Sequence, residues 1–307
     1  MADVLSRSFS FIFYIIIGYV LKRIGVLKKE DFRTLSRLLM TFTLPCAIIV
    51  NFSAMEQPDP ALLFLCVLGF LSNAVTMTIG YLRGRKQGTH EQAFQMLNLS
   101  GHSVGSVSLA YSQAFLSPLG VVATSLFDTG NSIMSTGING TVAELTAHRG
   151  EDGYRISVRG IVVSLLSSVP FVTYILMTVV AFVRLPVPAL IVRIASVGAG
   201  ANTFVAMLMM GVGLELHLSA GKRREILRLT AIRTVWVIVM TLLFLNLRFL
   251  SYEIRLGLVM AGMAPVSALA PPFTDRIGGD VEMSSTITSI GIIISMVMLT
   301  VFSLLTV

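Results

Sequence analysis

The chain has 307 residues, of which 54% are hydrophobic and only 13% are charged, with a formal net charge of +7. Soluble globular domains carry about 25% charged residues, so this composition, with a mean hydropathy of +0.82, excludes an ordinary soluble protein. The basic excess lies between long apolar runs, where it sets membrane topology, and it does not indicate nucleic-acid binding.

Ten apolar segments are predicted to cross a bilayer as α-helices, because they are continuous, roughly 20 residues long and without the alternation of barrel strands. They lie at residues 8–24, 33–54, 60–82, 90–116, 119–146, 157–183, 187–215, 226–247, 253–273 and 283–306. The first lacks a small-x-small cleavage site, so we expect it to remain as a helix. Cys46 and Cys66 fall inside these spans and are expected to be buried thiols.

Basic residues are distributed unevenly over the two sides that ten spans define. Seventeen lie in the odd-numbered connections, against five on the side of the termini and the even-numbered connections. The positive-inside rule then places the odd connections in the cytoplasm and both termini outside it, in a multi-pass protein of the cell (inner) membrane. Arg233 sits one to two turns inside span eight, and we expect it to anchor the helix by extending toward the interface.

The longest polar segment, "TAHRGEDGYRISVRG", separates five spans from five. Five is odd, so two similar halves would insert in opposite senses, as inverted repeats do. This predicts a first repeat at 1–147, a connector at 148–156 and a second, inverted repeat at 157–307. Short similar strings support the repeat: "VSLA" in span four with "VSALA" in span nine, and "TSLFDTGNSIM" in span five with "TSIGIIISM" in span ten.

Spans four and nine are predicted to be broken. Span four contains "NLSGHSVGSVSLAYSQAFL", which is rich in glycine and serine, and span nine contains "LVMAGMAPVSALAPPF", with three prolines. Glycine loosens a helix and proline removes a backbone hydrogen bond, and in hydrocarbon such breaks are tolerated where they line a polar cavity. Breaks in corresponding spans of both halves indicate a transporter site, at which helix N-termini would favour a carboxylate. The alternative is a pair of small-residue packing faces.

Three further stretches carry a resemblance to a known family. They are "GYVLKRIGVLKKEDFRTLSRLLMTFTLPCAII" (18–49), "GVGLEL" (211–216) and "MAPVSALAPPFTDRIGGDVEMSSTITSIGIIISM" (263–296). In order and spacing they resemble the auxin efflux carrier family, the PIN-like permeases of plants, fungi and bacteria, over essentially the whole chain. Two departures bear on the substrate and not on the fold: "GHSVGSVS" in span four and "ANTFVAML" in span seven lack prolines that many relatives have.

The resemblance implies a ten-helix carrier of two inverted five-helix repeats, with spans four and nine crossing at the substrate site and access alternating by an elevator-like movement. Bacterial relatives are associated with dicarboxylates such as malate and malonate, and plant relatives with the auxin anion. Relatives of this build are commonly homodimers, joined through spans two and seven. Pro45 matches the family's span-two proline, and Pro265 and Pro271 match its span-nine crossing.

The candidate residues follow from these patterns. Those expected to bind substrate are Pro45, His102, Ser103, Ser106, Asn131, Pro265, Ser267 and Pro271, and the one expected to couple ions or protons is Asp128. Each has a structural alternative: a simple kink for the prolines, helix packing for the serines, and for His102 a neutral ring bonded to freed backbone.

Asp128 lies inside span five with Asn131 on the same helix face. An acid within a membrane span is a functional hypothesis by default, either as a proton carrier or as a sodium ligand. The alternative is a protonated or paired structural acid bonded to the break of span four. The corresponding stretch of span ten has Ile292 and Ser295 where span five has the acid and the amide, which would leave a single acid at the centre.

Enzymatic readings find little support. "DTG" at Asp128 has the form of an aspartic-protease motif, but the chain has no second copy to share a proton. "GHSVG" around Ser103 lies in a membrane span and not on a strand-to-helix turn. Metal-ligand clusters and P-loop glycines are absent from the sequence. We therefore expect no catalysis, cofactor or metal, and a secondary carrier for a small organic anion, with a passive channel, a membrane-embedded sensor and, last, an intramembrane hydrolase as alternatives.

Overall fold

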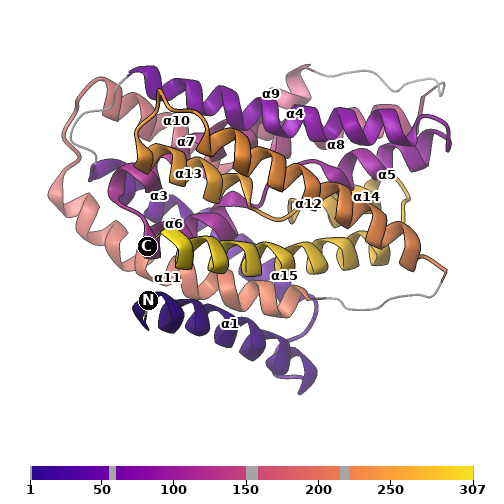
Figure 1. Cartoon of the computed structure of the whole chain (residues 1–307), viewed down its shortest axis with the longest axis horizontal. Helices are drawn as coiled ribbons and strands as arrows, with labels where there is room; N and C mark the ends of the chain where they lie inside the picture. The colour runs from indigo at the N-terminus through magenta and orange to yellow at the C-terminus, as the bar shows by residue number, and fades with distance from the viewer. Residues whose placement is uncertain (1, 55–59, 150–157, 215–220, 307) are drawn as a thin grey trace.

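The computed structural model describes residues 2–54, 60–149, 158–214 and 221–306. Those residues form helices and connections without a strand, and the helices run roughly along one direction (Figure 1). Five helical stretches are long and apolar enough to cross a membrane: Asp31–Ser53, Phe64–Gly84, Ala189–Gly213, Arg223–Leu245 and Val281–Thr306. The prediction of an all-α, polytopic membrane protein is confirmed.

The helices overlap the predicted segments in chain order, although several begin or end some residues beyond the predicted bounds. They are α1 (Ala2–Arg23), α2 (Asp31–Leu38), α3 (Leu44–Ser53), α4 (Phe64–Gly84), α5 (Thr89–Leu99), α6 (Leu109–Phe115), α7 (Pro118–Ser132), α8 (Asn139–Ala147), α9 (Val158–Leu166), α10 (Val169–Phe182), α11 (Ala189–Gly213), α12 (Arg223–Leu245), α13 (Tyr252–Gly262), α14 (Ala270–Arg276) and α15 (Val281–Thr306). Three π-helical turns, η1 (Leu39–Thr43), η3 (Val104–Ser108) and η4 (Ile133–Ile138), and a 3₁₀ turn, η2 (Pro60–Leu63), complete them.

The two breaks predicted in spans four and nine are present. In span four, residues 100–103 separate α5 from η3 and α6, and in span nine, residues 263–269 separate α13 from α14. Gly101 has a φ of +76°, a backbone conformation that glycine adopts freely and other residues rarely adopt. The chain thus leaves the helix at the glycine- and proline-containing positions that the sequence indicates.

Span six is predicted as one continuous helix, but the structure divides it into two helices. It is interrupted at residues 167–168, and Pro170 stands in the first turn of α10. Proline suits that position because the first amides of a helix have no intrahelical acceptor. Pro45 likewise stands in the first turn of α3, directly after the π-helical turn η1, so the helix of span two is irregular just before this proline.

The helices pack as two bundles. The smaller bundle contains α1, α2, η1, α3, α10 and α11, and the larger contains α4 to α8 with η3 and η4, and α12 to α15; the most extensive helix pairs all lie within one bundle or the other. Figure 1 shows α1 and α11 side by side at one edge and α4 at the opposite edge. Each bundle takes helices from both halves of the sequence. The beginning of α1 and the end of α15 lie at the same end of the molecule (Figure 1).

Glycines allow the backbones within each bundle to touch. In the larger bundle a Cβ atom at Gly69 or Gly130 would lie 1.9 or 1.7 Å from a carbonyl group of the facing helix, α7 or α4. In the smaller bundle a Cβ atom at Gly18 or Gly211 would lie 2.4 or 2.1 Å from a carbonyl oxygen of α11 or α1. No side chain fits at these four positions without moving a backbone.

The prediction that both cysteines are buried is wrong. Cys46 and Cys66 are free thiols, but they are partly exposed and not buried as expected. Most of the connector 148–156 and the last two residues of "GVGLEL" lie outside the described residues.

Candidate functional site

The two helix breaks meet and are hydrogen-bonded to each other. The Ser103 amide donates to the Pro265 carbonyl oxygen (3.0 Å), and the Ala268 amide donates to Ser103 Oγ (3.0 Å). Gly101 is so close to the other break that a Cβ atom there would lie 2.7 Å from Ser267 Cβ. Polar groups released by each break are thus satisfied by the other, as burial of irregular backbone requires. We call this region the crossing.

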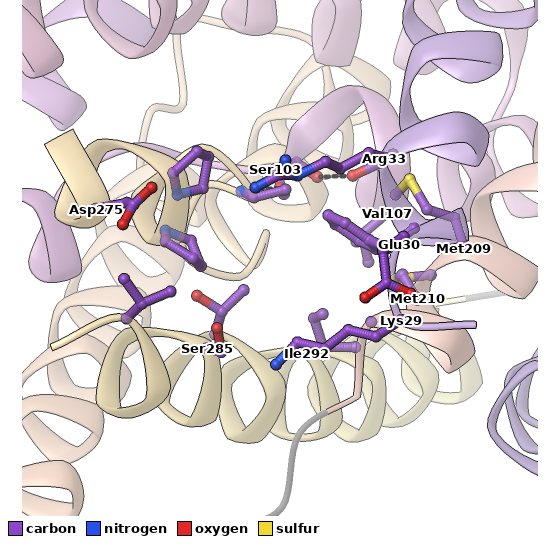
Figure 2. A pocket seen from close by; sticks show the side chains of 18 residues that line it. Lys29, Glu30, Arg33, Ser103, Val107, Met209, Met210, Asp275, Ser285 and Ile292 are labelled. Carbon is purple, nitrogen blue, oxygen red and sulfur yellow. Dashed lines mark hydrogen bonds between the residues drawn. The ribbon is translucent and has the colours of Figure 1, made fainter. Parts of the chain in front are cut away.

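A cavity of about 510 Å³ lies beside the crossing, between the two bundles. Its walls come from the breaks, from α2 and the connection before it, from α11 and from α15 (Figure 2). The lining residues are Lys29, Glu30, Phe32, Arg33, Ser103, Ser106, Val107, Met209, Met210, Gly213, Ala268, Pro271, Pro272, Asp275, Val281, Ser285, Thr288 and Ile292. Its volume suits a small organic molecule.

The cavity combines apolar walls with charges of both signs. Figure 2 shows Lys29 and Glu30 on the same side as Met209, and Asp275 on the opposite side. Arg33 adds a second positive charge, so the charged lining residues balance at two of each sign. The hydroxyls of the lining serines and of one threonine supply neutral hydrogen-bonding groups. The site can therefore hold a molecule with an apolar body and a few polar groups.

Arg233 on α12 contacts the crossing and is not among the residues that line the cavity. Its guanidinium donates to the Leu99 carbonyl oxygen (3.1 Å), to that of Gly101 (2.9 Å) and, at 3.4 Å, to that of Ala264. The side chain is only 5% exposed. The expectation that it extends toward the interface is wrong, because the carbonyl oxygens freed by the breaks offer the guanidinium buried acceptors inside the protein.

His102 is held between Arg233 and α4. The guanidinium lies 2.7 Å from Nδ1, and Ser72 Oγ lies 3.0 Å from Nε2. Because arginine has only donors, Nδ1 accepts and Nε2 carries the proton that is donated to Ser72. The ring is neutral in this arrangement, with both nitrogens engaged by side chains, and it is not among the residues that line the cavity.

Buried amide side chains fix the backbone of the break. Asn131 Oδ1 accepts from the His102 amide (3.0 Å), and its Nδ2 donates to the His102 carbonyl oxygen (2.7 Å). Asn73 on α4 donates to Asn131 Oδ1 (3.0 Å) and accepts from the Gly101 amide (3.0 Å). The two asparagines therefore replace the hydrogen bonds that a continuous helix would give residues 101 and 102.

Asp128 is buried behind the break, at 5% exposure. Its Oδ1 accepts from Asn131 Nδ2 (2.9 Å), its Oδ2 accepts from the Tyr174 hydroxyl (3.1 Å), and the Gly105 backbone also bonds to the carboxylate. Asp128 and Asn131 share a helix face and contact each other, as the sequence predicts. Since Tyr174 lies on α10, this carboxylate also links the larger bundle to the smaller one.

The structure brings the candidate residues together around the crossing, but not all in the cavity. Ser103, Ser106 and Pro271 line it. Pro265 and Ser267 lie in the break of span nine, where the carbonyl of the first and the hydroxyl of the second accept backbone hydrogen bonds. The other candidates lie outside the lining set: His102, Asn131 and Asp128 behind the break, and Pro45 in α3.

Several residues of the crossing were not singled out from the sequence. Asn73, Asn139 and Tyr174 all bond to groups at the break or to Asp128. Asn73 and Asn139 are amides inside apolar runs, which is a usable signal because polar groups in hydrocarbon are costly. The charged residues of the cavity were not singled out either, because Lys29, in the connection before α2, and Asp275, near the end of α14, lie outside the predicted spans.

The fold and the site together define a helical, membrane-type protein with two broken helices that cross beside a cavity. No family model matches the chain. A segment of 153 residues is 26% identical to a protein of Methanothermobacter thermautotrophicus (strain Delta H) named "Uncharacterized transporter". The match covers 48% of this chain and 49% of that protein, so the chain matches about half the length of its relative. The relative and the architecture support a transporter in general.

Proposed function

We propose that the protein is a secondary carrier that moves a small organic anion, such as a dicarboxylate or an auxin-like carboxylate, across the cell membrane. The observation that carries the proposal is the crossing: two broken helices, hydrogen-bonded to each other, beside a cavity of about 510 Å³. Irregular backbone at the centre of a helical membrane protein is tolerated where it lines such a cavity, and in carriers that is where substrate binds.

The preference for an anion rests on the groups that the span-four break presents. Ser103 and Ser106 line the cavity at the N-terminal end of η3. Such ends carry partial positive charge and bind carboxylates. Lys29 and Arg33 attract an anion toward the cavity, while the negative charges of Glu30 and Asp275 disfavour an anion with more than one negative charge. A monoanion or a singly protonated dicarboxylate fits this balance best.

The proposal includes ten spans arranged as two inverted five-helix repeats of the auxin efflux carrier type. Helix packing supports the repeat. Span one packs on span seven (α1 with α11), and span six packs on span two (α10 with α3). If spans one to five exchange places with spans six to ten, the pair of spans one and seven becomes the pair of spans six and two, as a two-fold pseudo-symmetry requires.

We propose that the protein moves by an elevator-like mechanism, and its division into two bundles supports this proposal. Both broken helices belong to the larger bundle, and the cavity lies between it and α11 of the smaller bundle. The larger bundle would carry the substrate past the smaller, which would form a homodimer through α3 and α11. Exposed apolar side chains on this side, including Phe42, Val197 and Phe204, supply a surface for the partner. We propose that the odd-numbered connections face the cytoplasm.

The direct test is uptake by purified protein in liposomes. Labelled malate, malonate and an aromatic carboxylate are offered under imposed proton and sodium gradients. A carrier gives saturable uptake and counterflow of at least one of them. A pore gives flux without saturation or counterflow, a sensor gives binding without flux, and either outcome contradicts the proposal.

Two serines on α15 provide a matched pair for locating the substrate. Ser285 lines the cavity, whereas Ser303 is buried on the same helix and its hydroxyl has no hydrogen-bond partner among the described residues. Ser285→Ala should raise the substrate concentration for half-maximal uptake by about 3- to 10-fold, the value of one hydrogen bond, and Ser303→Ala should leave it unchanged. Equal effects of the two substitutions would place the substrate elsewhere.

Asp128 is proposed as the coupling residue, with a proton or a sodium ion as the coupled species. Its position at the span-four break and its contact with Tyr174 of the other bundle support this role. Asp128→Asn keeps the shape and removes the charge. Normal transport by this variant at every pH and sodium concentration would end the coupling hypothesis.

A further inference from the structure

At the two breaks, the ends of the helices leave carbonyl oxygens that attract a cation. Leu99 is the last residue of α5, Gly101 lies in the break after it, and Ala264 follows the end of α13. The last carbonyl groups of a helix have no intrahelical donor and carry partial negative charge. In carriers with broken helices, such half-helix ends and unwound carbonyls are the groups that coordinate sodium ions or protons.

Here the same oxygens are occupied by a side chain. The guanidinium of Arg233 donates to all three, from 2.9 Å at Gly101 to 3.4 Å at Ala264, and to His102 Nδ1 at 2.7 Å. Within the described part of the chain, no carboxylate forms an ion pair with Arg233. Its charge is balanced by carbonyl dipoles, and these belong to both broken helices.

We propose that Arg233 is a tethered cation that fills the cation position of the crossing, so that the protein needs no sodium ion there to hold its broken helices together. Guanidinium is charged at every physiological pH and presents donors in several directions, so one side chain can serve oxygens from both spans. Arg233 is therefore a positioning residue and not a substrate contact. In describing the protein as a carrier the inference rests on the proposed function, and it leaves Asp128 as the position at which a coupled ion would bind.

Thermal unfolding of the purified protein in detergent tests the inference without transport. The wild-type midpoint should be the same in sodium chloride and in choline chloride. Arg233→Ala leaves three carbonyl oxygens without their cation and should lower the midpoint by roughly 5–10 °C. Sodium or methylguanidinium ions, by refilling the vacated position, should raise the midpoint of this variant by several degrees and leave the wild type unchanged.

Arg255 supplies the matched control. Its guanidinium donates to the Leu245 carbonyl oxygen (2.8 Å) at the end of α12, away from the crossing. Arg255→Ala should lower the midpoint without rescue by either cation, since that single carbonyl does not form a cation site. Arg233→Lys keeps a positive charge and should remain insensitive to sodium.

The outcomes separate cleanly. A wild-type or Arg233→Lys protein that is stabilised by sodium over choline overturns the inference, as does an Arg233→Ala protein that neither cation rescues. If Arg233→Ala cannot be purified, the sodium series on the wild type and on Arg233→Lys decides. Absence of any organic-anion uptake would overturn the proposed carrier and leave these thermal results to stand by themselves.

Discussion

Gly101→Ala is the substitution that most directly probes the crossing. Gly101 has a φ of +76°, and a Cβ atom there would lie 2.7 Å from Ser267 Cβ and 3.3 Å from Ser135 Oγ. Its amide and carbonyl are both engaged, by Asn73 and Arg233. The added methyl group therefore strains the backbone and also pushes the span-nine break away from the span-four break.

The two contributions can be sized separately. A left-handed conformation costs an alanine about 1–2 kcal/mol, and forcing a methyl group into a filled space costs about 1–3 kcal/mol. Their sum, roughly 2–5 kcal/mol, corresponds to a fall of about 4–10 °C in the unfolding midpoint at about 2 °C per kcal/mol for a chain of this size. The assay is thermal unfolding in detergent, and the readout is the loss of the monodisperse peak in size-exclusion chromatography.

Gly278→Ala isolates the conformational part. Gly278 also has a positive φ, +63°, but a Cβ atom there would meet nothing within 4 Å. The unfolding midpoint of this control should fall by only about 2–4 °C, because the substitution strains the backbone and meets no neighbouring atom. Equal losses in the two variants would refute the reasoning, because they would mean that the two breaks do not touch at Gly101.

Two further predictions concern polar contacts. Tyr174→Phe removes the hydroxyl that donates to Asp128 (3.1 Å) and should cost about 1.5–3 kcal/mol of stability, because the acceptor is a carboxylate. Tyr111→Phe removes a hydroxyl that bonds to the neutral hydroxyl of Thr300 and should cost about 0.5–1.5 kcal/mol. The order of the two unfolding midpoints checks this, and a reversed order contradicts it. At the connection before α15, burial raises the pKa of the Asp280 carboxyl, but the hydrogen bonds from Lys222 and from the Met283 and Glu282 backbone, with the positive charge of Lys222, together hold the pKa below its ordinary value. This stabilisation is complete above the unfolded-state pKa of about 3.9 and is lost as the pH falls through the lower folded-state pKa. A small difference in midpoint between the wild type and Asp280→Asn at pH 6 should therefore vanish toward pH 3, and a difference that grows on acidification would count against it.

The sequence predicts the broken helices because their cause is local. Glycine and serine around Gly101 and the prolines from Pro265 onward act on their own backbone, and no knowledge of the partners is needed. The interruption before Pro170 was missed, although its cause is also local. It was missed because a single proline in an apolar run is equally compatible with a kink inside a continuous helix.

The site was harder to predict because its chemistry depends on pairings between distant segments. Arg233 follows the end of α5 by more than a hundred residues, and nothing in its neighbourhood shows that carbonyl groups of two breaks will converge on it. The cavity charges are hard to predict for the same reason: Lys29 and Asp275 line opposite sides of one cavity, although they lie in different halves of the sequence. By contrast, the contact between Asp128 and Asn131 was predictable, since a spacing of three residues fixes it on one helix.

The glycine contacts within the bundles also have a mechanical consequence. At Gly69 and Gly130 the backbones of α4 and α7 touch directly, so no side chains lie between them that could slide past each other. The backbones of α1 and α11 touch in the same way at Gly18 and Gly211. Between the bundles, the approach at Gly105 is made by the tip of the Leu44 side chain, which can change rotamer. The backbone contacts therefore make each bundle stiffer than this side-chain contact makes the layer between the bundles. A change in the lateral pressure of the bilayer would deform the molecule first along that layer, beside the cavity.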